Sequence, residues 1–163
     1  MNPAGDHPPK DRPLPPNVVE VSAALIFQCG KILLTQRPPG SHLAGLWEFP
    51  GGKREPLETF EQCLVREIRE ELGITIAVGR LFDSISHQYP QKSVLLKFFV
   101  CRLLAGVPRP LACAQWVWAN PEELNAYSFP AADRQLLEKL RNSPAVWQND
   151  PDSILKTSGS PGN

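Results

Sequence analysis

The segment "GGKREPLETFEQCLVREIREELGI" (residues 51–74) carries the clearest local pattern in this chain. Apolar residues recur every three or four positions between Thr59 and Leu72, a spacing that predicts an amphipathic helix. Gly73 follows the last apolar position and is typical of a helix C-terminus. Thr59, with Gln62 three residues later, resembles a capping box. The segment is therefore expected to form a capped helix behind a pair of glycines.

Acidic residues crowd the last turns of this predicted helix. Glu67, Glu70 and Glu71 stand at positions i, i+3 and i+4, on an arc beside the apolar stripe. The last two lie near the negative end of the helix dipole, which disfavours them. Arg66 can pair with one carboxylate but cannot neutralise three. Hard oxygen ligands at this spacing suit a magnesium or manganese ion, and a solvated helix face decorated with ion pairs is the alternative interpretation.

The residues before the helix favour the metal interpretation. Pro50, Gly51 and Gly52 precede it, and backbone without a Cβ atom can approach a ligand closely and offer a carbonyl oxygen to a cation. Lys53 follows, and its ammonium group suits phosphate oxygens. Glycines, a lysine and an acidic helix together indicate a site for a metal ion and a polyphosphate.

Composition limits the class of partner. Basic and acidic residues each number 17, so no overall charge favours a long nucleic acid or an anionic membrane surface. The four cysteines are widely separated, with no spacing typical of zinc, and are expected to be free thiols. No apolar run approaches the roughly 18 residues of a membrane span. We therefore expect a cytoplasmic protein with a small-molecule partner, either a monomer or a homodimer.

Composition along the chain predicts one domain between two flexible tails. Residues 1–17 are rich in proline, and residues 142–163 mix proline, glycine, serine and asparagine, so residues 18–141 are expected to form the domain. Strands and two substantial helices alternate there, which predicts an α+β fold: a mixed β-sheet in an α/β/α sandwich. Besides the helix above, the expected elements are strands at 18–28, 31–36, 93–103 (covered on both faces) and 115–119, a short helix at 121–127 and a final helix at 131–141.

The long segment resembles a complete Nudix box. The resemblance rests on Gly52, Glu58, Arg66, Glu67, Ile68, Glu70, Glu71, Gly73 and Ile74 at the spacing of that motif. It extends over residues 18–141, where "LLTQRPPGSHLAGLWEFPGGK", "HQYPQKSVLLKFF" and "FPAADRQLLEKL" are similar to the MutT-like nucleoside triphosphate pyrophosphohydrolases. The family implies a Nudix fold and a magnesium ion, for which manganese can substitute.

The resemblance also implies a reaction and roles for the box residues. A metal-activated water would attack a nucleotide polyphosphate and release a nucleoside monophosphate and pyrophosphate. The expected function is the removal of oxidised purine nucleotides such as 8-oxo-dGTP, an activity linked to DNA repair. The implied roles are metal binding or water activation for Glu67, Glu70 and Glu71, a metal-binding carbonyl for Gly51, orientation of the glutamates for Arg66, and support for Glu58.

Substrate choice depends on residues outside the box. Arg37 resembles a phosphate-contacting arginine, or is an exposed charge at a strand end; Phe49 would lie beside the base or in the core. Asp133 occupies the position of a base-reading asparagine in the 8-oxo-dGTP enzymes, or is simply a residue favoured at a helix N-terminus. An ionised aspartate only accepts hydrogen bonds, so cytosine, adenine and guanine amino groups are all candidate donors. A CTP or 5-methyl-dCTP pyrophosphohydrolase is therefore the alternative function.

One departure from the family leaves two further alternatives open. Relatives often supply another carboxylate from the loop before the 115–119 strand, but this chain has no aspartate or glutamate between Asp83 and Glu122. His87 and Gln88 are the candidates for a partial substitute. A weakly active nucleotide-binding protein is thus one alternative. The other is a base-recognition module similar to the C-terminal domain of adenine glycosylases, suggested by Ser86 and His87 but disfavoured by the complete box.

Overall fold

A seven-stranded mixed sheet forms the centre of the structure, a computed structural model that describes residues 17–148. The strands run in the order β3-β2-β1-β6-β5, with β4 paired to β1 and β7 paired to β2. Only the pair β1–β6 is parallel among these described strands. The predicted mixed sheet is therefore confirmed. The strands are β1 (Val18–Gln28), β2 (Lys31–Gln36), β3 (Trp47–Glu48), β4 (Gly51–Lys53), β5 (Thr75–Gln88), β6 (Ser93–Ala105) and β7 (Gln115–Ala119).

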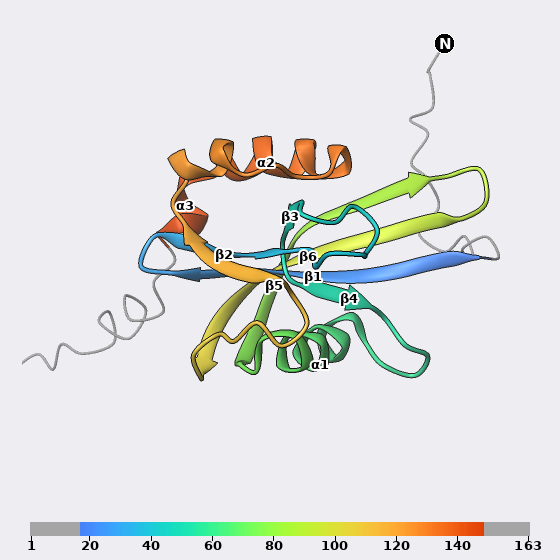
Figure 1. Cartoon of the computed structure of the whole chain (residues 1–163), viewed down its shortest axis with the longest axis horizontal. Coiled ribbons are helices and arrows are strands. Elements are labelled where there is room, and N and C mark those ends of the chain that lie inside the picture. The colour runs from blue at the N-terminus through green and yellow to red at the C-terminus, as the bar shows by residue number, and fades with distance from the viewer. Residues whose placement is uncertain (1–16, 149–163) are drawn as a thin grey trace, which may run out of the picture.

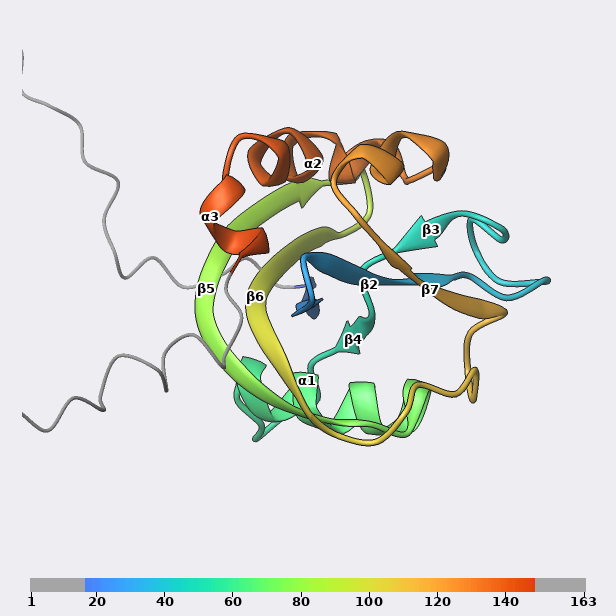
Figure 2. The same ribbon diagram turned by 90° about the vertical axis from the view of Figure 1, so that its left-hand side faces the viewer.

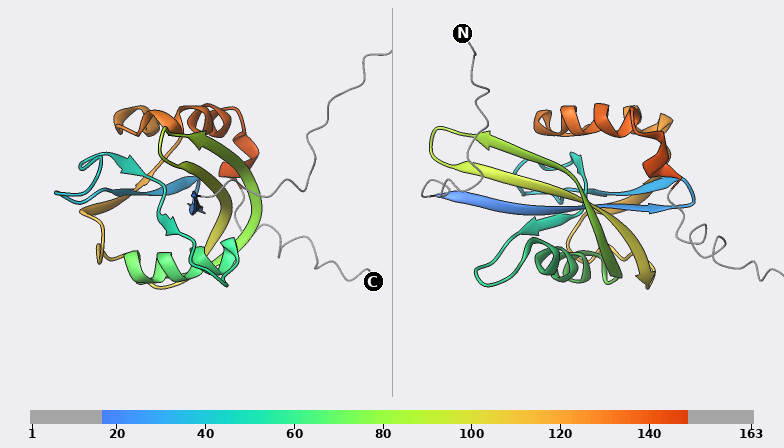
Figure 3. Two further views of the ribbon diagram at one scale, coloured as in Figure 1. Left: turned by 90° about the vertical axis from the view of Figure 1, so that its right-hand side faces the viewer. Right: turned by 180° about the vertical axis from the view of Figure 1, so that it is seen from behind.

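Helices cover both faces of the sheet, as the sequence predicted. Helix α1 (Phe60–Leu72) lies on one face, and α2 (Arg134–Arg141) and α3 (Pro144–Trp147) lie on the other (Figures 1 and 2). The views from the opposite sides agree (Figure 3). Leu64, Ile68 and Leu72 of α1 are fully buried against one side of the sheet. No helix within residues 17–148 is long and apolar enough to cross a membrane.

The predicted caps of α1 are present. The Thr59 hydroxyl accepts a hydrogen bond from the Gln62 backbone N–H at 3.1 Å, and the Gln62 side chain accepts one from the Thr59 N–H at 2.9 Å. At the other end Gly73 has φ 67°, a left-handed conformation that favours glycine, and donates to the Arg69 carbonyl at 3.0 Å. These local contacts set where the acidic turn of the helix begins and ends.

Strand β6 is covered on both faces, as predicted, and its partner β5 was not predicted. Phe98 and Val100 belong to the core beneath α2, whereas Phe99 and Cys101 belong to the core beneath α1. The register of β5 against β6 shifts at three places, and β5 contains Gly79. Such bulges break the alternation of apolar and polar side chains from which a strand is recognised.

The predicted flexible tail from residue 142 is wrong for residues 142–148. Helix α3 forms there, and Val146 and Trp147 are buried. The Trp147 indole N–H donates to the Leu140 carbonyl at 2.9 Å, and its ring meets the Phe27 ring edge-on at 5.3 Å. An indole that buries its large surface and satisfies its donor holds the segment in place.

Two predicted helices differ in detail from the observed ones. The short helix expected at 121–127 is a 3-10 helix, η1 (Glu122–Ala126). The helix expected at 131–141 divides into the 3-10 helix η2 (Ala131–Asp133) and α2. The remaining tail predictions, residues 1–16 and 149–163, lie outside the described residues.

Candidate active site

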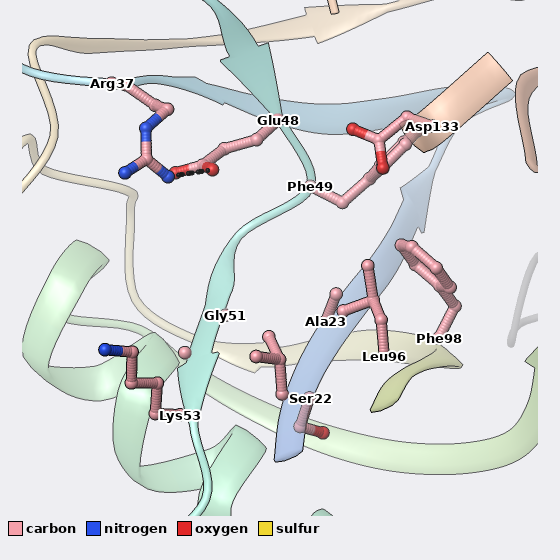
Figure 4. Close-up of a pocket in the computed structure, with 12 residues that line it drawn as sticks. Ser22, Ala23, Arg37, Glu48, Phe49, Gly51, Lys53, Leu96, Phe98 and Asp133 are labelled. Carbon is pink, nitrogen blue, oxygen red and sulfur yellow. Dashed lines mark hydrogen bonds and ion pairs between the residues drawn. The ribbon is translucent and has the colours of Figure 1, made fainter. Parts of the chain in front are cut away.

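A cavity of about 300 Å³ opens beside β1, β3 and β4 (Figure 4). It brings together all four residues that the sequence suggested for substrate binding: Arg37, Phe49, Lys53 and Asp133. The two cationic side chains come from the ends of β2 and β4, and Asp133 comes from the segment before α2. The full lining is Val21, Ser22, Ala23, Arg37, Glu48, Phe49, Gly51, Gly52, Lys53, Leu96, Phe98 and Asp133.

Gly51 and Gly52 each lie so close to another part of the protein that a larger residue would overlap it. A Cβ atom at Gly51 would overlap the backbone carbonyl of Ser22 on β1, because β4 lies tightly against that strand. A Cβ atom at Gly52 would instead overlap the carboxyl group of Glu67. The backbone of Gly52 therefore forms the surface on which the Glu67 carboxylate rests.

Arg66 holds three of the acidic side chains. Its guanidinium donates to Glu58 at 2.6 and 3.0 Å, to Glu67 at 2.9 Å and to Glu70 at 3.4 Å. These bonds to Arg66 are the main cause that lowers the Glu58 pKa to about 2, and the backbone N–H of Glu55 adds to the effect. Glu58 thus remains an anion that anchors Arg66, and Arg66 in turn fixes the direction of the Glu67 carboxylate.

Glu71 faces a different environment. Only 9% of the residue is exposed. Burial, followed by the charge of Glu48, raises the Glu71 pKa to about 7. A carboxylate buried near a second carboxylate is stabilised by a divalent cation, which neutralises both.

The donor set fits a divalent cation. Glu67, Glu70 and Glu71 supply hard oxygen atoms from adjacent positions of α1, and the Gly51 carbonyl belongs to the neighbouring strand. Within residues 17–148, no three histidine, cysteine, aspartate or glutamate side chains already converge closely enough to hold an ion. Binding of an ion would therefore draw these carboxylates closer together than they lie in the metal-free protein.

Glu48 is a site residue that sequence reasoning missed. Its carboxylate pairs with Arg37 at 2.8 Å, and its charge raises the pKa of both Glu71 and Asp133. It therefore lies between the acidic helix and the far end of the cavity. The available signal was a charged residue directly before Phe49 in an otherwise apolar strand segment, "LWEFP".

Asp133 and Phe49 lie together at the inner end of the cavity. Asp133 is 7% exposed, and burial, then the charge of Glu48, raises its pKa to about 6. It is the N-cap residue of α2 but makes no side-chain capping bond, so its carboxyl group is available to a ligand. Phe49 stacks on Phe129 at 5.5 Å and meets Phe98 edge-on at 6.1 Å. Phe49 is therefore both a core residue and a wall of the cavity.

The loop that lacks the expected carboxylate lies directly against α1. Backbone N–H groups of Leu111 and Ala112 donate to the Glu71 carbonyl at 3.1 and 3.3 Å. His87, the suggested substitute, lines a second cavity of about 640 Å³ together with His42. It is not part of the lining of the first cavity.

Known proteins resemble this chain in sequence and in fold. The NUDIX domain model matches residues 22–139. The CTP pyrophosphohydrolase of Escherichia coli K12 is 44% identical over 121 residues, covering 74% of this chain and 90% of that protein. The 8-oxo-dGTP diphosphatase of Haemophilus influenzae is 35% identical over 126 residues, covering 77% of this chain and 93% of that protein.

Solved structures repeat the same architecture. The solution structure of the E. coli ORF135 protein superposes with a TM-score of 0.69 at 40% identity, covering 82% of this chain and 96% of that one. A MutT structure described for Aliivibrio salmonicida and Vibrio cholerae has a TM-score of 0.65 at 29% identity, covering 76% of this chain and 96% of that one. The family match spans the whole acidic helix and every residue of the cavity lining except Val21, and so this chain belongs to the Nudix family, as a MutT-like pyrophosphohydrolase.

Proposed function

We propose that this chain hydrolyses nucleoside triphosphates to a monophosphate and pyrophosphate, with Mg²⁺ as the metal and Mn²⁺ as a substitute. The observation that carries the proposal is the shared cavity. Its lining joins two cations, Arg37 and Lys53, to the glycine pair at one end and to Asp133 at the other. A triphosphate with its base attached needs positive charge at one end and a polar base-binding group at the other.

The residues of the site have three proposed roles: metal binding, phosphate binding and orientation of the carboxylates. Glu67, Glu70, Glu71 and the Gly51 carbonyl would hold the metal, which lowers the pKa of bound water and screens phosphate charge. Arg37 and Lys53 attract the phosphate oxygens. Arg66 keeps the carboxylates oriented, because it bonds to two of them and is itself anchored by Glu58.

Two classes of base fit the inner end of the cavity. Guanine-type bases such as 8-oxoguanine present N1–H and N2–H₂ donors side by side, and an ionised Asp133 accepts from both. Nucleotide-pool sanitation of oxidised purines, such as 8-oxo-dGTP, is therefore the first candidate function. Cytosine nucleotides are the second, because a protonated Asp133 donates to cytosine N3 and accepts from its amino group. Relatives named for each activity support both candidates.

A nucleotide panel tests the proposed function. The full chain is assayed for pyrophosphate release from 8-oxo-dGTP, dGTP, CTP, dCTP, 5-methyl-dCTP and 2-oxo-dATP, with Mg²⁺, with Mn²⁺ and with a chelator. We expect metal-dependent release, with 8-oxo-dGTP or a cytosine nucleotide highest in kcat/KM. Nucleotide binding without pyrophosphate release would instead identify a non-hydrolytic binding protein.

Base preference is expected to change with pH. Because the Asp133 pKa is raised to about 6, its carboxyl group in acid is neutral and offers one donor and one acceptor, whereas above that pH it is ionised and both oxygens accept. The ratio of kcat/KM for 8-oxo-dGTP to that for dCTP should rise by up to about 100-fold between roughly pH 5 and pH 7, because the ionised form increases about tenfold while the protonated form falls about tenfold. Both nucleotides compete in one reaction, so pH effects on the shared catalytic step cancel in the ratio.

The matched control for this experiment is Asp133→Asn. An amide keeps one donor and one acceptor at every pH, so the ratio should become independent of pH. A ratio that rises equally in Asp133→Asn and in the wild type would assign the pH effect to another group, and Asp133 would then not read the base.

A further inference from the structure

Thr35 carries a buried polar atom that no neighbour satisfies. The residue lies in the middle of β2 and has no exposed surface. Its hydroxyl oxygen has no hydrogen-bond partner among residues 17–148. An unpaired hydroxyl in a protein interior costs free energy of folding, so it needs an explanation.

The position of Thr35 in the sheet directs its side chain toward the acidic helix. Side chains alternate along a strand, so Thr35 shares its face with Leu33, which packs in the core beneath α1. Its direct partners on the neighbouring strands are Glu48 on β3 and Trp116 on β7, and Trp116 packs against the same core. The hydroxyl therefore lies at the end of that core where Glu71 of α1 is buried.

The Glu71 carboxyl group is the neighbour that the hydroxyl affects. Burial and the charge of Glu48 raise the Glu71 pKa, and the nearby Thr35 hydroxyl acts in the opposite direction by favouring the ionised form. The two groups are near enough for the hydroxyl to influence the carboxyl group, but they do not make a hydrogen bond of ordinary geometry. A small rotation of the Glu71 carboxylate would supply the acceptor that Thr35 lacks.

A valine would fill the same space without an unpaired hydroxyl. Valine has the shape of threonine and the same preference for strands, and the surrounding core is apolar. With threonine at this position, the metal-free protein is expected to be less stable than it would be with valine. Groups that reduce the stability of the ligand-free protein often lie at functional sites, where they make an interaction in the ligand-bound state.

We propose that Thr35 is a positioning residue whose hydroxyl donates a hydrogen bond to Glu71 when that carboxylate binds a divalent metal. One carboxylate oxygen then faces the metal and the other accepts from Thr35, which fixes the plane of the group. The proposal rests on the proposed function, because Glu71 is a metal ligand there. Partners of this kind change metal affinity even though they do not touch the ion.

Thr35→Val tests the proposal because two effects of opposite sign are expected. The Tm of the metal-free protein should rise by about 2–4 °C, since the unpaired hydroxyl is gone. The dissociation constant for Mn²⁺, measured by electron paramagnetic resonance of the free ion, should rise about tenfold, which means weaker binding. A residue with a merely structural role would not raise Tm and weaken metal binding together.

Thr35→Ser and the wild type complete the experiment. Serine keeps the hydroxyl, so Mn²⁺ affinity should return close to the wild-type value although the methyl group is lost. An unchanged dissociation constant in Thr35→Val overturns the proposal, and so does a lower Tm, because the hydroxyl would then be satisfied in the metal-free state. If the wild type itself neither binds Mn²⁺ nor releases pyrophosphate, the proposed function fails instead.

Discussion

Glu67→Gln and Glu71→Gln are each expected to lower kcat by at least about 100-fold while the fold stays intact. An amide has no negative charge, so it is a poor ligand for a hard cation and cannot neutralise it. Neither substitution opens a cavity. For Glu71 the change also removes a buried carboxyl group that lies close to the charge of Glu48. The Tm of metal-free Glu71→Gln is therefore expected to be no lower than that of the wild type.

Glu61→Gln is the matched control for these two variants. Glu61 lies in the first turn of the same helix and is exposed, so the same chemical change falls outside the site. Turnover is measured at saturating Mg²⁺ with the best nucleotide of the panel, and circular dichroism reports the fold. Near-normal turnover in both site variants would refute the assignment of the acidic helix. A loss of turnover in all three variants, Glu61→Gln included, would point to a general effect on α1.

Gly52→Ala and Gly51→Ala are expected to fail in different ways although they are neighbours. The new methyl group at position 52 meets only the carboxyl end of Glu67, a flexible side chain that can move aside. Gly52→Ala should therefore fold but lose about 100-fold in kcat, because Glu67 is displaced. The methyl group at position 51 meets the backbone of β1 at Ser22, which cannot move without breaking the sheet. Gly51→Ala should lower the free energy of unfolding by about 3 kcal/mol.

A double variant separates displacement of Glu67 from other effects of Gly52→Ala. If the alanine acts only by moving Glu67, then Gly52→Ala combined with Glu67→Gln should have the kcat of Glu67→Gln alone. Additive losses would show that the glycine backbone serves the site independently. Urea denaturation of Gly51→Ala measures its stability, and a wild-type midpoint would contradict the close packing of β4 on β1.

The parts of the fold that could be predicted are those set by local contacts. Helix α1 was predicted with both ends because Thr59, Gln62 and Gly73 interact with their own neighbours in sequence. The strands β1 and β2 were predicted because one tight turn at Cys29 and Gly30 joins them. In contrast, the register shifts that conceal β5 depend on how it pairs with β6, which no short window of sequence contains.

The same distinction explains what was found in the site and what was not. The glutamates of α1 are separated by one helical turn or less, so their spacing alone predicts that they share one part of the helix surface. Glu48 was missed because it meets Thr35 only through the pairing of β2 with β3. Asp133 reaches the cavity from a distant part of the chain, and it was predicted from the family resemblance rather than from spacing. Helix α3 was missed because its burial depends on one tryptophan that packs on Phe27.

The parallel pair β1–β6 bears on how fast this enzyme can form. Its register joins Val18 to Ser93 and Phe27 to Arg102, so the chain must close a long loop before this ladder begins. Contacts between such distant parts of the sequence slow the approach to the native state. Because β4 pairs with the opposite edge of β1, the glycine pair acquires its final place only once β1 is held, and catalytic competence is expected to emerge late in refolding.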